Sequence, residues 1–151
     1  MADLTPMNAD AESAMTAFLR GQIRFAEFIE RMRHFLVVDF DGAPATIRYR
    51  RPLEARVTVG PADLYPVLES YLAGDRDETE LGRWAQILDM MTEFGPAPDT
   101  PDEEADRLEP MWDVLAQLGG PPFLGRVTTD SVRAYTARLR ALEVELPTRA
   151  T

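Results

Sequence analysis

The chain of 151 residues contains no cysteine, no lysine and only one histidine, His34. Without cysteine there is no disulfide, no thiolate nucleophile and no cysteine ligand for a metal. One histidine cannot build a multi-histidine metal site, and His34 beside an apolar stripe is typical of a surface or helix-terminal position. We therefore predict no metal site and no cofactor. Because lysine is absent, all 16 basic residues are arginine, which we interpret as a GC-rich coding bias typical of some bacteria.

Long apolar runs are also absent. The opening stretch MADLTPMNADAE has neither a basic start nor an apolar run, and no segment reaches membrane-spanning length. We expect no signal peptide, no membrane association and a cytoplasmic location. The net charge of −10, with a pI near 4.5, disfavours nucleic acid as a partner and leaves a basic protein or a cation. The length and the 45% hydrophobic content predict a single domain, 1–151, with a real core.

What the chain does have is helical spacing of apolar residues, which predicts a mainly α fold of about six helices built on helical hairpins. The expected order is a helical hairpin at 9–35, an extended segment at 37–60, a second helical hairpin at 63–94, an acidic loop and helix at 95–118, a C-terminal helix at 128–142 and a frayed tail at 143–151. The predicted core residues are Phe18, Phe28, Ile29, Met32, Leu68, Leu72, Leu81, Trp84, Leu88, Trp112, Leu115 and Leu139.

The two hairpins use the same punctuation, 53 residues apart. The shared positions are an aromatic-Leu-x-Gly ending at Gly21 or Gly74, and six residues later a Glu followed by a large apolar residue, at Glu27 and Glu80. Glycine suits the left-handed conformation that ends many helices, and a capped restart suits any helical hairpin. Duplication and convergence are therefore equally favoured.

Helix starts are predicted from capping residues. Asp63 is expected to cap the third helix, with Pro66 in its first turn, and Asp77 with Glu80 forms a capping box for the fourth. A further capping box is expected at Thr100, Pro101 and Glu103. Pro110 then kinks or splits the following helix near Glu109, and Thr128 or Thr129 caps the last one.

The segment 37–60 changes to a period of two. Ile47 and Tyr49 alternate with arginines, and Val57 and Val59 alternate with polar residues. We predict two short strands with Pro52 between them, as a β-ribbon or an extended crossover between helices two and three. The arginines here, Arg48, Arg50, Arg51 and Arg56, are expected to pair with acids of the stretch 63–113, within the molecule or across a dimer.

Acidic residues are concentrated in one part of the chain. Between Asp63 and Asp113 there are 15 Asp or Glu and three Arg, a net charge of −12, whereas Arg20 to Arg56 carries +3. Acids favour helix starts and solubility, but a cluster also suits a surface that meets a basic partner. The candidate partner-binding residues are Asp75, Asp77, Glu78, Glu80, Asp102, Glu103, Glu104 and Asp106. No nucleophile elbow, calcium loop or phosphate loop is present, and no catalytic residue is assigned.

The paired pattern of a helix, x-Leu-x-Gly, and then Glu with an apolar residue resembles small bacterial immunity proteins of the colicin D immunity-like kind. The resemblance rests on Phe18 to Met32 and Leu64 to Leu88, and extends to the region 114–139. It implies a short, acidic, mostly helical cytoplasmic protein that binds and neutralises a toxin, often a basic nuclease. No binding residue is carried over from the family.

These observations order three hypotheses. The first is a non-enzymatic protein-binding module, an acidic inhibitor or immunity protein that neutralises a basic toxin. The alternative is a self-associating scaffold or accessory protein, with a homodimer as the assembly and Met-rich apolar contacts. An enzyme acting on a cationic small molecule ranks last, because nothing in the sequence places two carboxylates in one cleft.

Overall fold

The fold is mainly helical, with a small antiparallel ribbon between the second and third helices. The structure, a computed structural model of the chain, describes residues 4–39, 46–51, 53–95, 100–119 and 128–145. The elements in these ranges are α1 (Leu4–Leu19), α2 (Phe25–Met32), β1 (Leu36–Asp39), β2 (Thr46–Tyr49), β3 (Val57–Thr58), α3 (Pro61–Leu72), α4 (Glu78–Met90), β4 (Phe94–Gly95), α5 (Asp102–Arg107), α6 (Glu109–Leu118) and α7 (Thr129–Glu145).

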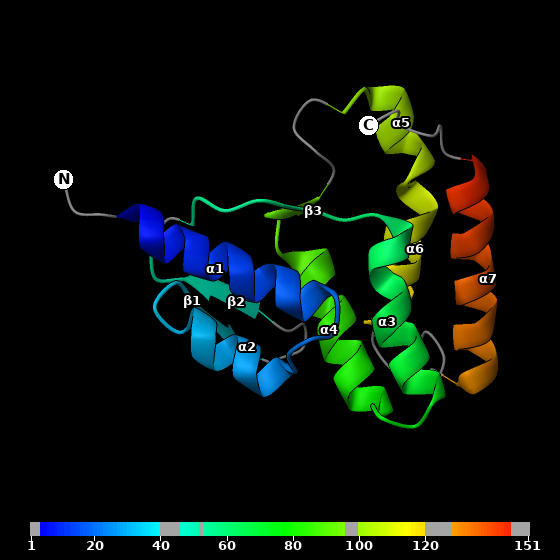
Figure 1. Cartoon of the computed structure of the whole chain (residues 1–151), viewed down its shortest axis with the longest axis horizontal. Helices are drawn as coiled ribbons and strands as arrows, with labels where there is room; N and C mark the ends of the chain where they lie inside the picture. The colour runs from blue at the N-terminus through cyan, green and yellow to red at the C-terminus, as the bar shows by residue number, and fades with distance from the viewer. Residues whose placement is uncertain (1–3, 40–45, 52, 96–99, 120–127, 146–151) are drawn as a thin grey trace.

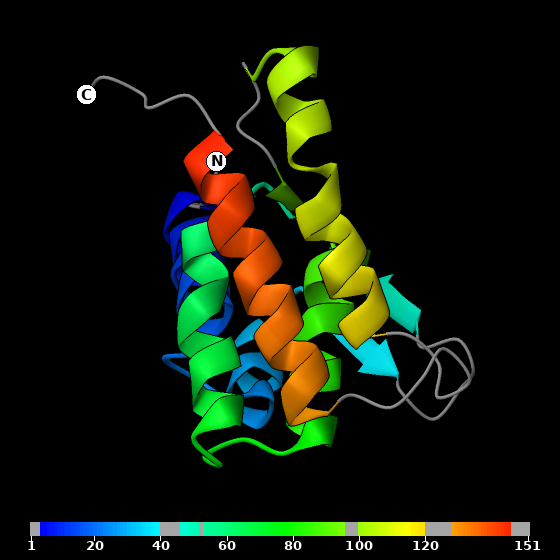
Figure 2. The ribbon, with the colours of Figure 1, turned by 90° about the vertical axis from the view of Figure 1, so that its right-hand side faces the viewer.

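The helices form two groups that share one core (Figure 1). On one side, α1 packs on α2, and α2 contacts β1 of the ribbon. On the other side, α3 packs against α7 and α4 against α6, so that these four helices stand next to one another (Figure 2). Helix α4 also contacts both α1 and α2, and therefore joins the two groups. Helix α5 extends beyond the rest at one end of the molecule (Figures 1 and 2).

Both predicted glycine stops adopt the same helix-ending motif. At Gly21 (φ 76°) the N–H groups of Gly21 and Gln22 donate to the carbonyls of Phe18 and Ala17, at 3.1 and 2.8 Å. At Gly74 (φ 85°) the equivalent bonds, to the carbonyls of Tyr71 and Ser70, measure 3.0 and 2.9 Å. This pair of bonds closing on a left-handed glycine is the Schellman motif. The shared punctuation is therefore one structural device used twice, and its origin by duplication or convergence stays open.

The predicted start of α3 is wrong. The helix begins at Pro61, with Gly60 as the N-cap residue, and Asp63 lies in the first turn. The Asp63 carboxylate accepts a hydrogen bond from the Gly60 N–H at 2.9 Å, while the Asp63 N–H donates to the Gly60 carbonyl at 3.0 Å. Proline at the first helical position loses no hydrogen bond, which is why the helix starts there. Pro66 consequently lies inside the helix.

Of the two hydrogen bonds that a capping box at the start of α4 requires, only one is present. Asp77 is the N-cap residue, and its side chain accepts a hydrogen bond from the Glu80 N–H at 2.8 Å. Among the described residues, the Glu80 carboxylate does not return a bond to the Asp77 N–H, and its Oε2 is buried without a hydrogen-bond partner. The capping box is therefore half formed.

The strands on either side of Pro52 do not pair with each other, as a ribbon formed by those two strands would require. β1 and β2 form the antiparallel ribbon, with Leu36 opposite Tyr49 and Asp39 opposite Thr46. β3 does not join them: it pairs in parallel with β4, which lies where the second predicted hairpin ends and the acidic loop begins. The Val57 and Val59 N–H groups donate to carbonyls of Glu93 and Gly95 at 2.9 and 3.0 Å. A period of two identifies a strand but does not choose its partner.

The acidic segment after β4 forms a helix, as predicted, but the helix does not start from the predicted cap. Helix α5 begins after Pro101, and no side chain caps it, so the predicted capping box at Thr100 is wrong. The predicted split at Pro110 is confirmed: α5 ends at Arg107 and α6 begins at Glu109, with Leu108 between them. Because this split adds a helix, the described residues contain seven helices instead of about six.

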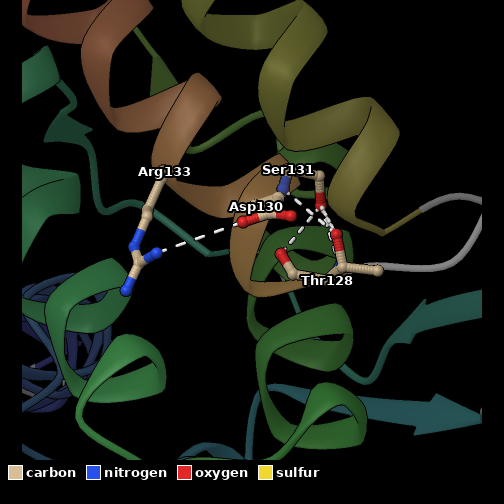
Figure 3. Close-up of polar contacts among 4 residues, drawn as sticks. All are labelled: Thr128, Asp130, Ser131 and Arg133. Carbon is tan, nitrogen blue, oxygen red and sulfur yellow. Dashed lines mark hydrogen bonds and ion pairs between the residues drawn. The ribbon is translucent and has the colours of Figure 1, made fainter.

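Helix α7 starts from a hydroxyl cap (Figure 3). The Thr128 Oγ1 accepts from the Ser131 N–H at 3.1 Å, and the Ser131 Oγ accepts from the Thr128 N–H at 2.8 Å. Thr128 is therefore the cap, not Thr129. The helix continues to Glu145, past the predicted end at 142, because Leu142 is buried and Glu143 accepts a hydrogen bond from Tyr65 of α3 at 2.6 Å. The rest of the predicted frayed tail lies outside the described residues.

The core agrees closely with the prediction. All predicted core residues are buried except Ile29, Leu72 and Trp112, which are half-buried against it. The Phe18 and Phe28 rings stack at 4.2 Å and hold α1 to α2. Among the described residues, no helix combines the length and apolar character that crossing a bilayer requires.

Candidate functional site

The first predicted acidic group lies at the turn into α4. The side chains of Asp75, Asp77 and Glu78 are exposed, and that of Asp77 is occupied in capping the helix. Glu80 differs from them because it is half-buried, and its Oε2 is buried without a hydrogen-bond partner among the described residues. Glu80 is thus turned toward the protein, while Asp75 and Glu78 face outward.

Beside Glu80 lies a buried arginine that the sequence pattern did not reveal. Arg76 is only 6% exposed, and it joins the two hairpins: its Nη2 donates to the Gly21 carbonyl at 2.9 Å and its Nε to the Ser70 Oγ at 3.3 Å. Burial lowers the pKa of Arg76, the nearby charge of Arg24 lowers it further, and Glu80 opposes both. An arginine within an acidic run gives no sign of burial, so only the fold identifies it.

A second bond from α4 completes this joint. The Trp84 indole N–H donates to the Leu19 carbonyl at 3.2 Å, and the Trp84 side chain is fully buried. Together, Arg76 and Trp84 bind the carbonyls of Leu19 and Gly21, which the end of α1 leaves without a helical partner. We call these four residues the hairpin joint. Its role is structural.

The second predicted acidic group forms α5, and its environment is different. None of the residues of α5 is buried. Asp102, Glu103 and Asp106 are exposed, and Glu104 is half-buried with an interaction of its own. Glu103 pairs with Arg107 at 3.4 Å on the same exposed face. We call the helix α5 the acidic arm. It contributes almost nothing to the core.

The two acidic groups do not form one continuous surface. The turn into α4 and the acidic arm lie at opposite ends of the molecule in both views (Figures 1 and 2). A partner of modest size would therefore contact one group or the other. The two groups lie close together in the sequence, which gives no indication of their separation in space.

Three of the four arginines from β2 to β3 lack the acidic partners predicted for them in the described part of the chain. In the part of the chain that the structure describes, Arg48, Arg50 and Arg56 form no ion pair, and all three are exposed. The link from the strand to the acidic stretch is made by Tyr49, whose hydroxyl donates to Glu93 at 2.7 Å. The predicted intramolecular pairing is therefore wrong for these three arginines, and pairing across a dimer stays a prediction.

Two features that resemble catalytic groups have simpler explanations. Ser131 and Asp130 lie together at the start of α7, but Ser131 bonds Thr128, and Asp130 pairs with Arg133 at 4.0 Å (Figure 3). Asp89 lines a cavity of about 360 Å³, and partial burial raises the pKa of its otherwise exposed carboxyl. No second carboxylate lines that cavity in the described part of the chain. The described residues also contain no cluster of carboxylates and histidine suited to a metal ion.

No family model, curated protein or solved structure matches this chain. The resemblance to the colicin D immunity-like proteins accordingly rests on the sequence patterns alone. The function must be argued from the surface.

Proposed function

We propose that the protein is a non-enzymatic protein-binding module, an acidic inhibitor that neutralises a basic protein. Its most specific form is an immunity protein directed at a toxin with a basic active-site cleft. The single observation that carries this proposal is the acidic arm, a helix with four acids and no buried residue. A segment that adds so little to the core is free to serve an interface instead.

Charge gives the arm a mechanism. Exposed acids on one projecting element attract a basic surface over a distance of about 10 Å at ordinary ionic strength, which speeds encounter and orients the partner. Glu109 and Asp113, both exposed on α6, add two acids on the helix that follows the arm. Placement at helix starts explains the first-turn acids of the arm, but it does not explain Asp106 or Asp113. These last two favour an interface.

A matched pair of double variants tests the location of the contact. Glu103→Gln with Asp106→Asn removes two charges from the arm, and Asp75→Asn with Glu78→Gln removes two from the turn into α4. Both pairs alter the net charge equally, and all four side chains are exposed. With a basic partner identified by affinity capture, the arm variant should associate several-fold more slowly at low salt and show a flatter salt dependence.

The control separates a local contact from general attraction. If the arm is the contact, the variant at the turn into α4 should slow association much less than the arm variant does. Equal slowing by the two variants would show that only the net charge matters. Unchanged association in both would refute the proposal that an acidic surface meets the partner. Asp77 is left intact because its side chain caps α4, and Glu80 because it is half-buried.

Three exposed arginines in and after β2 favour one alternative, a self-associating protein. Arg48, Arg50 and Arg56 are exposed and unpaired in the described part of the chain, while the acidic arm is exposed elsewhere on the same molecule. A second copy would bring the two together. Sedimentation at low and high salt tests this: a salt-sensitive homodimer that Arg50→Gln weakens would support it, and a monomer at both salts would exclude it.

A further inference from the structure

A groove separates α2 from the ribbon, and the proposed protein-binding function does not use it. It has a volume of about 540 Å³, within the range of small-molecule sites. Three parts of the fold build it: α2 through Phe25 and Ile29, the ribbon, and α4 through Arg83. The residues that line it are Phe25, Ile29, Val37, Val38, Asp39, Thr46, Arg48 and Arg83.

The floor of the groove is apolar and incompletely covered. Phe25, Ile29, Val37 and Val38 are all half-buried. The first two and Val38 also touch the core, whereas Val37 does not. Register explains this difference, because Val37 faces Arg48 across the ribbon while Leu36, on the opposite face, is buried. The groove therefore exposes apolar surface that no described element of the chain covers.

The rim of the groove carries two guanidinium groups and one carboxylate. The Arg83 guanidinium lies over the Phe25 ring at 5.1 Å from its centre, so its position is fixed by the groove wall. Arg48 is exposed and has no hydrogen-bond or ion-pair partner among the described residues. Among the described lining residues, Asp39 supplies the one negative charge. These described residues thus carry a net positive charge within a protein whose net charge is −10.

We propose that this groove binds a small carboxylic acid with an apolar body. The body would lie on Phe25, Ile29 and Val37, and the carboxylate would meet the unpaired guanidinium of Arg48. The planar fork of arginine matches the two oxygens of a carboxylate, and apolar walls with few polar groups are typical of small-ligand sites. Binding of a cation is disfavoured here, because two guanidinium groups flank the opening.

Three probes that share one apolar body test the charge requirement. They are naphthoate, neutral naphthamide and the cation naphthylmethylammonium, titrated into the intact protein and followed by amide chemical shifts and calorimetry. Naphthoate should saturate with shifts concentrated at Phe25, Ile29 and Val37, and should bind about fivefold more tightly than naphthamide. The cation should bind most weakly. Equal affinity for the three, or no saturable binding of naphthoate, would overturn the proposal.

Two neighbouring arginines provide a matched pair of variants. Arg48→Gln should lower naphthoate affinity about fivefold and leave naphthamide affinity unchanged. Arg50→Gln should alter neither, because Arg50 is also exposed and unpaired among the described residues but does not line the groove. An equal loss in both variants would indicate general attraction of anions and would refute a specific site. Neither variant depends on a protein partner, so this result is independent of the proposed inhibitor function.

Discussion

The hairpin joint makes its sharpest prediction at Gly21, and Gly74 serves as the control. Both glycines end helices with a positive φ, so alanine at either position meets the same backbone strain, about 1–2 kcal/mol. Their surroundings differ. A Cβ at Gly74 would meet nothing within 4 Å, whereas a Cβ at Gly21 would lie 2.8 Å from the Val67 Cγ2 and 3.0 Å from the Arg76 Nη2.

The steric part of the cost falls on groups that cannot move freely. Val67 is fully buried, and the Arg76 Nη2 is held by its hydrogen bond to the Gly21 carbonyl. Overpacking of this kind costs about 1–3 kcal/mol. Gly74→Ala should therefore lower the free energy of unfolding by about 1–2 kcal/mol, and Gly21→Ala by about 2–5 kcal/mol.

Urea unfolding followed by tryptophan fluorescence measures both variants, and an unchanged m-value establishes that only stability has changed. The ordering of the two variants matters more than either value. Equal losses, or a larger loss at Gly74, would mean that the second hairpin does not pack closely on the end of α1. That result would refute the close packing described for the hairpin joint.

Three further outcomes are expected. Trp84→Ala should lower the free energy of unfolding by about 3–5 kcal/mol, because it removes a fully buried side chain; a loss below about 1 kcal/mol would mean that the indole is exposed. Burial first, and then its hydrogen bond to Glu143, raises the pKa of Tyr65 to about 12. Between pH 10 and about 12 the folded protein therefore keeps the Tyr65 proton that the unfolded chain releases, so the free energy of unfolding should fall as the pH rises from about 10 to about 12. Tyr65→Phe should reduce that loss. Alkaline unfolding followed by circular dichroism measures it. Replacing Arg48 and Arg50 together with Gln should change the free energy of unfolding by less than about 0.5 kcal/mol, since both are exposed and unpaired among the described residues; a larger drop in melting temperature would show a structural role.

The sequence predicts the elements of this fold better than their partners. Helical spacing locates the buried faces of α1, α2, α4 and α6, because burial on one side of a helix leaves a direct trace in the order of residues. The two glycine stops are equally visible, since few other residues adopt a positive φ. Strand pairing is not visible in this way. β3 pairs with β4 because α4 returns the chain to a position beside β3. No local sequence pattern indicates this return.

The candidate surfaces show the same limit. Counting charges identifies the acidic stretch correctly, but only the fold separates the turn into α4 from the acidic arm. The sequence lists Glu80 and Glu78 together as candidate contacts, yet Glu80 is half-buried and Glu78 is exposed. The groove beside the ribbon combines residues from three separated segments, and its lining has no signature in any one of them.

The most direct test of the proposed function is the association rate of the protein with its captured basic partner, measured at low and high salt. Wild-type protein should associate rapidly at low salt and lose most of that advantage at high salt, and Glu103→Gln with Asp106→Asn should remove much of the salt dependence. The matched Asp75→Asn with Glu78→Gln variant should retain most of it. An association rate that is insensitive to salt, or that depends on the turn into α4 and not on the acidic arm, would contradict the account.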